Sequence, residues 1–182
     1  MKVSREQMAE NRSRILTEAA RLFRDKGFEA VSVAEVMKAA GLTHGGFYGH
    51  FASKDDLIAQ TVAHALTRQD VGGGAESFLA AYLSPAHRDA PATGCPTAAF
   101  ASDARRQTPE ARAAMAAGTA AQIARLAAAL ESQGVGDARG AAIGCWSAAV
   151  GALILARAVG DEALSDEILD RTRGWIAASL KG

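Results

Sequence analysis

The sequence has 182 residues, which is enough for one domain or for two small domains that share a core. Hydrophobic residues make up 49% and charged residues 22%, a mixture that excludes disorder over most of the chain and also excludes a membrane bundle. The 20 Lys and Arg residues balance 20 Asp and Glu residues, so no global field attracts nucleic acid or an anionic membrane. Any argument for DNA binding therefore has to be local.

The composition favours helices over strands. Alanine supplies 43 positions and glycine 18, whereas aromatic residues are only 5%, a pattern typical of helices that pack closely through small side chains. The most apolar stretch, residues 141–156, is shorter than the roughly 20 residues of a membrane-spanning helix and is predicted to be a buried core helix. With two cysteines, no CxxC motif and no signal-peptide pattern, we expect a cytoplasmic protein.

Helix start and stop signals divide the chain into short segments. Serines at positions 4, 32 and 53 open helices as capping residues, and Thr43 can cap a very short one. Glycines end several of the segments, and the proline-containing stretch 84–94 is predicted to be a loop. The predicted all-α fold has about nine helices, over residues 4–26, 32–40, 43–51, 53–70, 75–83, 95–107, 108–133, 137–159 and 165–180.

The first three predicted helices form a module. Helices as short as the second and third are not stable alone, because isolated helices need about 12–15 residues, so both must pack on the first. Two short helices joined by a tight, glycine-containing turn are typical of a helix-turn-helix, whose later helix enters the major groove of DNA. Residues 1–26 carry seven basic and four acidic side chains, a local excess of positive charge.

The residues of this module resemble the TetR/AcrR family of bacterial transcriptional regulators. The resemblance runs from Ile15 to Leu57. Its most specific parts are Ala39-Ala40-Gly41-Leu42-Thr43, Gly45-Gly46-Phe47-Tyr48-Gly49-His50-Phe51 and Ser53-Lys54-Asp55-Asp56-Leu57.

The resemblance implies a set of DNA-binding residues. Thr43, Tyr48 and His50 would lie on or near phosphates, Lys54 would reach the DNA backbone, and Ser32 would present a helix start to a phosphate. Base readout would fall to four neighbouring positions, with the Phe47 ring contacting thymine methyl groups; the sequence equally allows this ring to pack in the core. These four candidates are His44, Gly45, Gly46 and Phe47. Because glycine has no side chain to read bases, we expect close backbone approach to the DNA.

The resemblance also implies two functional domains. Residues 1–52 would bind DNA, and residues 53–182 would form a helical regulatory and dimerisation domain, with the helix over about 53–70 as the connector. The partners would be a double-stranded, palindromic operator and a second copy of the chain, which docks through the last two helices. An unknown small molecule would release this repressor from its operator.

The small number of bulky side chains in the alanine-rich frame suggests a pocket for that small molecule. The candidate lining residues are Phe78, Tyr82, Phe100, Met115 and Trp146, each of which could instead be ordinary core. Cys95 is a candidate thiol sensor, because it starts a predicted helix and helix N-termini stabilise thiolates; a buried structural cysteine is the alternative.

No enzyme motif is present. The four histidines form no HExxH motif, and the chain contains neither GxSxG nor a glycine-rich phosphate loop after a strand, so we expect no catalytic residues, no metal and no cofactor. The alternative function is a helical ligand-binding or interaction protein without specific DNA binding. The effector, the operator, the target genes and the choice between repression and activation lie beyond the sequence.

Overall fold

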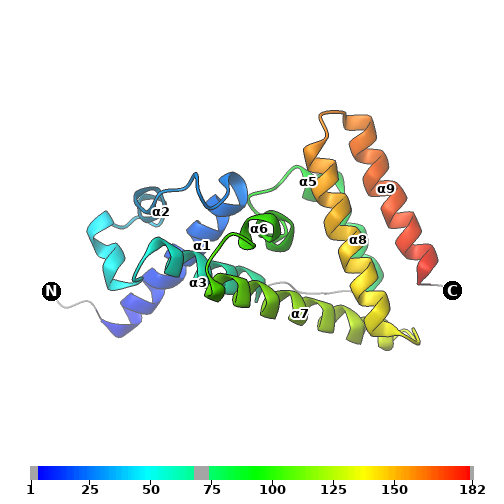
Figure 1. Cartoon of the computed structure of the whole chain (residues 1–182), viewed down its shortest axis with the longest axis horizontal. Helices are drawn as coiled ribbons and strands as arrows, with labels where there is room; N and C mark the ends of the chain where they lie inside the picture. Colours follow the sequence, from blue (N-terminus) through cyan, green and yellow to red (C-terminus); the bar gives the residue numbers. More distant parts are fainter. Residues whose placement is uncertain (1–3, 68–73, 181–182) are drawn as a thin grey trace. The chain divides into compact units, whose positions relative to one another are not determined.

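The computed structural model describes residues 4–67 and 74–180, and all regular structure in these two ranges is helical (Figure 1). Nine α-helices and one 3₁₀ helix are present there, which confirms the all-α fold class. In chain order they are α1 (Arg5–Lys26), α2 (Val33–Ala39), η1 (His44–Gly49), α3 (Lys54–Leu66), α4 (Ala75–Tyr82), α5 (Pro85–Arg88), α6 (Pro96–Ala104), α7 (Pro109–Glu131), α8 (Ala138–Ala158) and α9 (Glu162–Ser179).

All three predicted serine caps form. Ser4 Oγ accepts from the Gln7 amide at 3.1 Å, and the hydroxyls of Ser32 and Ser53 accept from amides three residues ahead at 3.2 and 3.1 Å. Gly27 ends α1 at a φ of 81°, a conformation that suits glycine. The boundaries of α1, α2 and α3 therefore follow from local hydrogen bonds.

Two predicted elements differ in type from the structure, and the last helix begins at Glu162, with Asp161 as its cap, rather than at 165. The stretch 84–94 is not entirely loop, because Ser84 caps the short helix α5 and Pro85 occupies its first turn, where no amide donor is needed. The third helix is 3₁₀ rather than α, and three of its six residues are glycines, which disfavour a regular α-helix. The last part of the connector predicted over 53–70 lies outside the described residues.

The chain divides into two compact units. The first comprises Met1–Arg68 with Cys95–Gly118, and the second comprises Gln69–Gly94 with Thr119–Gly182. The first unit therefore includes α3 and α6 as well as α1, α2 and η1. The predicted DNA-binding domain, in contrast, ends at residue 52, before α3. The reason for this difference is packing, since α3 buries Leu57, Ile58 and Val62 in the core that it shares with α1. The functional division stays a prediction.

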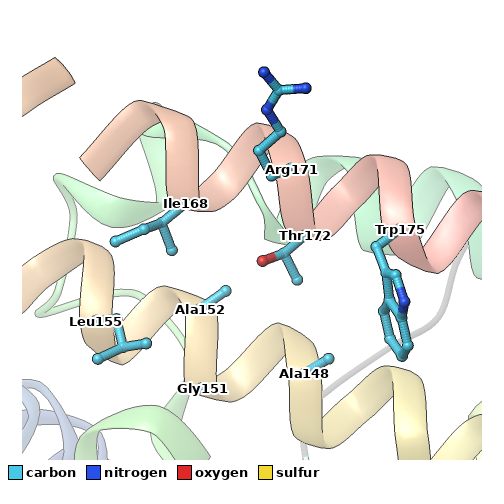
Figure 2. A pocket seen from close by; sticks show the side chains of 8 residues that line it. All are labelled: Ala148, Gly151, Ala152, Leu155, Ile168, Arg171, Thr172 and Trp175. Atoms are coloured by element: carbon cyan, nitrogen blue, oxygen red, sulfur yellow. The ribbon is translucent and has the colours of Figure 1, made fainter. Parts of the chain in front are cut away.

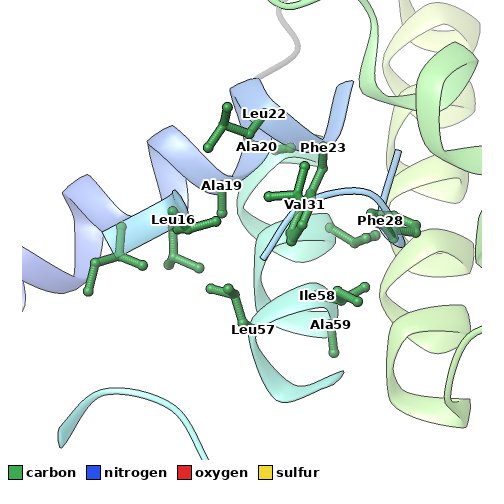
Figure 3. Close-up of a cluster of buried hydrophobic side chains, with 14 of the residues drawn as sticks. Leu16, Ala19, Ala20, Leu22, Phe23, Phe28, Val31, Leu57, Ile58 and Ala59 are labelled. Carbon is green, nitrogen blue, oxygen red and sulfur yellow. The ribbon is translucent and has the colours of Figure 1, made fainter. Parts of the chain in front are cut away.

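The core of the first unit is aromatic at its centre. Phe28 packs between Phe23, at 5.2 Å between ring centroids, and Phe100, at 5.1 Å. Figure 3 shows Phe28 and Ile58 among the aliphatic side chains that α1 and α3 contribute to this cluster. Aromatic pairs at these separations add to the stabilisation that burial alone provides.

In the second unit, α8 and α9 pack as a helical pair, and α5 is tied to them by Arg88 (Figure 1). The Arg88 guanidinium donates to Ser165 Oγ at 2.8 Å and to Asp166 Oδ1 at 2.6 Å, and it also pairs with Asp89 at 2.7 Å. These carboxylates raise the pKa of Arg88 above its ordinary value. The short helix α5 therefore owes its place to charged hydrogen bonds as well as to its proline.

Helices α7 and α8 are long and apolar enough to cross a membrane by length and composition alone. In α8 the buried residues include Cys145, Trp146 and Leu153, so one face of this helix is used in the protein core. Helix α7 carries Arg112 and Arg125 among its alanines. A core helix of a water-soluble protein has the same composition, so the two segments are weak evidence for a membrane.

Candidate nucleic-acid interface

The turn between α2 and η1 has the predicted glycine. Gly41 adopts a φ of 68°, in the left-handed region that side chains rarely enter, and the chain then reaches Thr43, the N-cap of η1. Thr43 is exposed and its hydroxyl makes no capping hydrogen bond. A phosphate oxygen could therefore accept a hydrogen bond from this hydroxyl without breaking a contact within the protein.

Helix η1 has one buried and one exposed aromatic residue in adjacent positions. Phe47 is 1% exposed and packs on Phe51 at 5.7 Å between centroids, so it belongs to the core and cannot reach thymine methyl groups as assigned from the sequence. Tyr48 is 72% exposed and touches the edge of Phe47 at 5.2 Å. The small unit needs the Phe47 ring to fill its centre, which leaves Tyr48 as the aromatic side chain available to a partner.

The other predicted recognition residues lie around Tyr48. His44, Gly45 and Gly46 are all exposed. A Cβ on Gly45 would meet nothing within 4 Å, whereas one on Gly46 would approach Met37 Cε at 3.7 Å. Only His44 among these three offers a side chain that could hydrogen-bond to a base edge.

Two of the predicted phosphate-binding residues, Ser32 and Lys54, already make hydrogen bonds within the protein. The Ser32 hydroxyl already accepts the capping hydrogen bond of α2, and Lys54 Nζ donates to the Glu29 carbonyl at 3.3 Å. Burial lowers the pKa of His50, and the nearby Arg12 cation lowers it further, so both effects favour the neutral imidazole. A neutral His50 can still donate one ring N–H to a phosphate, but it adds no positive charge.

Sequence reasoning did not single out Arg12, which makes contacts at the end of η1. Its guanidinium donates to the His50 carbonyl and to Gln60 Oε1, and its Cζ lies 4.6 Å from the centroid of the Phe51 ring. The local excess of positive charge near the N-terminus was the only signal in the sequence. It did not separate Arg12 from the other basic residues of the segment.

Three of the five predicted pocket residues lie together in the second unit. Trp146 is 5.1 Å from Tyr82 and 6.0 Å from Phe78 between ring centroids, and the buried Trp146 Nε1 has no hydrogen-bond partner among the residues that the structure describes. Phe100 is buried in the core of the first unit, and Met115 packs against the same core. The predicted set is thus divided between the two units, because bulky residues are scarce and each unit uses some of them for its own core.

The pair α8–α9 carries an exposed apolar surface. Leu155 is 56% exposed and Trp175 is 58% exposed, and both border a groove of about 460 Å³. Figure 2 shows Ala148, Gly151, Ala152 and Leu155 on α8 opposite Ile168, Thr172 and Trp175 on α9. Large apolar side chains that remain exposed next to small ones are typical of a surface that another protein covers.

Cys95 is the N-cap residue of α6 and is only 5% exposed. Arg24 lies near enough to interact with it electrostatically, although burial lowers the pKa of that guanidinium. Cys145 is also buried, and burial raises the pKa of its thiol. Within the described ranges no three His, Cys, Asp or Glu side chains are grouped as metal ligands would be.

Known proteins resemble part of this chain in sequence. A family model described as "Bacterial regulatory proteins, tetR family" matches residues 15–61. The HTH-type transcriptional regulator AcrR of Shigella flexneri is 40% identical over 57 residues, which are 31% of this chain and 26% of that protein. The HTH-type transcriptional repressor KstR2 of Mycolicibacterium smegmatis is 34% identical over 56 residues, 31% of this chain and 27% of the relative. The matched segment thus spans about a quarter of these relatives.

Solved structures resemble the chain over nearly its whole length. Reduced NemR of E. coli has a TM-score of 0.74 at 21% identity, covering 92% of this chain and 95% of that one. A TetR-family transcriptional regulator from Agrobacterium tumefaciens has a TM-score of 0.73 at 24% identity, with 92% and 97% covered. At these identities the likeness establishes the fold.

Proposed function

Because this chain belongs to the TetR/AcrR family of bacterial transcriptional regulators, we propose that it is a repressor that binds a palindromic operator as a homodimer and is released by a small molecule. Such a protein acts in the cytoplasm, where the chromosome is.

The observation that supports DNA docking is that η1 has one buried residue, Phe47, next to exposed residues that can contact DNA. The Phe47 ring anchors the helix in the core, while Tyr48, 72% exposed, and the exposed residues Thr43 and His44 are available to DNA. Hydroxyls and a neutral imidazole can donate hydrogen bonds to phosphates, which fix the register of the protein on the duplex. The exposed glycines allow the backbone of η1 to come close to the DNA.

The exposed apolar surface of α8 and α9 supports dimerisation. A twofold dimer buries the same patch of both subunits, so Leu155 and Trp175 would each meet the corresponding surface of the second copy. The small residues Ala148 and Gly151 between them permit close approach of helices. A symmetric dimer presents two recognition helices, which is what a palindromic operator requires.

The aromatic group of the partly buried Phe78 and the buried Tyr82 and Trp146 supports binding of an effector in the second unit. The unpartnered Trp146 Nε1 favours a ligand that brings a hydrogen-bond acceptor to an apolar surrounding. Release from DNA requires that effector and operator prefer different conformers, and couplings between such sites are typically about 1–3 kcal/mol.

Selection of bound sequences from random double-stranded DNA tests the proposal. We expect the selected duplexes to contain an inverted repeat with half-sites about one helical turn apart, and binding to weaken steeply with salt. Sedimentation velocity of the protein alone is expected to give a dimer. If the chain selects no sequence at low ionic strength, the alternative of a helical ligand-binding or interaction protein without specific DNA binding replaces the repressor.

A further inference from the structure

Arg12 connects three elements at the end of the recognition helix. Its two terminal nitrogens donate to the carbonyl of His50, the residue after η1, and to Gln60 Oε1 on α3. Its Cζ also lies 4.6 Å from the centroid of the Phe51 ring. The planar guanidinium suits this arrangement, because its fork of donors can serve two acceptors while its face stacks on an aromatic ring.

The network continues from Gln60 to the turn that follows η1. Gln60 Nε2 donates to Asp56 Oδ1 at 2.6 Å, and the Ala52 amide donates to Asp56 Oδ2 at 2.9 Å. The Asp56 amide in turn donates to Ser53 Oγ at 3.1 Å. These hydrogen bonds hold residues 50–53 against α3 on one side, while Arg12 holds them against α1 on the other. We call this set of contacts the Arg12 network.

Helix η1 depends on such support more than an ordinary helix would. It is a six-residue 3₁₀ helix, longer than most, and half of its residues are glycines, which disfavour regular helix. Its N-cap residue, Thr43, makes no side-chain capping bond. The buried ring of Phe47 anchors its middle, and the Arg12 network holds its C-terminal end.

We propose that Arg12 is a positioning residue for DNA recognition, which fixes the end of η1 and thereby the exposed Tyr48 without contacting DNA itself. Both terminal nitrogens of Arg12 are engaged within the protein and its guanidinium stacks on Phe51, so the cation is committed to the fold. This inference rests on the proposed function, because the quantity that it explains is affinity for an operator.

The test compares Arg12→Met with Arg14→Met in the full-length chain. Both changes remove one positive charge from the same helix, but Arg14 is exposed and, within residues 4–67 and 74–180, bonds only to Asn11, one turn away, at 3.0 Å. The probe is a duplex selected from random DNA by the wild-type protein. We expect Arg12→Met to weaken binding about tenfold, since hydrogen bonds of charged groups are worth at least that factor. Arg14→Met should change affinity less than about twofold.

Salt dependence separates positioning from phosphate contact. Loss of a phosphate contact lowers the slope of log affinity against log salt by about one, whereas loss of a positioning residue leaves the slope unchanged. The pKa of His50, followed by NMR, should rise in Arg12→Met because the neighbouring cation is gone, and should stay constant in Arg14→Met. Arg12→Lys should recover part of the affinity, because it keeps the charge and one of the two hydrogen bonds.

If Arg12→Met fails to fold, a second variant, Gln60→Met, tests the same network. Gln60→Met removes the far acceptor of Arg12 and the contact to Asp56 without touching η1. It should weaken DNA binding in the same direction, and the double variant should be no weaker than the more affected single one, because both act through one network.

The outcomes distinguish this inference from the function on which it rests. Unchanged binding by folded Arg12→Met, an equal loss in Arg14→Met, or a slope lowered by about one would each overturn the positioning role while leaving a DNA-binding repressor intact. A wild-type chain that selects no duplex would overturn the proposed function itself and this inference with it.

Discussion

Phe47 and Tyr48 provide the sharpest test of how η1 works, because adjacent aromatic residues have opposite exposure, 1% and 72%. Truncation of a fully buried phenylalanine to alanine costs about 3–5 kcal/mol of unfolding free energy. That is a large share of the roughly 5–15 kcal/mol by which a domain is usually stable. Tyr48→Ala removes only an exposed ring and its edge contact with Phe47, worth at most about 0.5–1.5 kcal/mol.

The two variants should therefore separate stability from DNA binding. Urea denaturation followed by circular dichroism is expected to show a large loss for Phe47→Ala and a small one for Tyr48→Ala. Fluorescence anisotropy with a selected duplex is expected to show Tyr48→Ala binding about three- to tenfold more weakly, since a neutral hydrogen bond contributes about 0.5–1.5 kcal/mol. The salt slope should not change, because tyrosine carries no charge. Equal destabilisation by both variants, or wild-type binding by folded Tyr48→Ala, would refute the inference that Phe47 stabilises the fold while Tyr48 contacts DNA.

Three further predictions concern backbone approach, dimerisation and the cysteines. Gly45→Ala should raise the free energy of unfolding by about 0.4–1 kcal/mol, because its Cβ meets nothing within 4 Å, yet weaken binding to a selected duplex; unimpaired binding would contradict close approach of the backbone at this position. Trp175→Asp should leave the helical circular dichroism spectrum unchanged, because the side chain is 58% exposed, and shift the sedimentation coefficient to that of a monomer. A persistent dimer would place the interface elsewhere. Iodoacetamide at pH 7 should leave Cys145 unmodified in the native protein, because this thiol is buried and burial raises its pKa. Mass spectrometry that finds Cys95 unmodified in the native protein would count against a thiol sensor.

Much of the first unit was predictable because its signals are short-range. A capping serine and its acceptor position are three residues apart, and Gly27 ends α1 within one turn of the last buried residue, Phe23. The same local rules failed for α5, where the serine and proline that start the helix stand in a stretch whose composition is typical of a loop. The 3₁₀ form of η1 was also missed, because periodicity does not distinguish it from a very short α-helix.

The sequence by itself determined which segments become helices and which motif relates the chain to known regulators, since both depend on residues that are neighbours along the chain. Only the tertiary structure decided whether Phe47 is buried or faces DNA, because the local pattern left both open and the outcome depends on what the rest of the unit packs against this ring. It also decided the role of Arg12, whose acceptors lie 38 and 48 residues away. Contacts at that separation arise from the folding of the whole unit, and no hydrophobic periodicity or helix-capping pattern in the sequence predicts them.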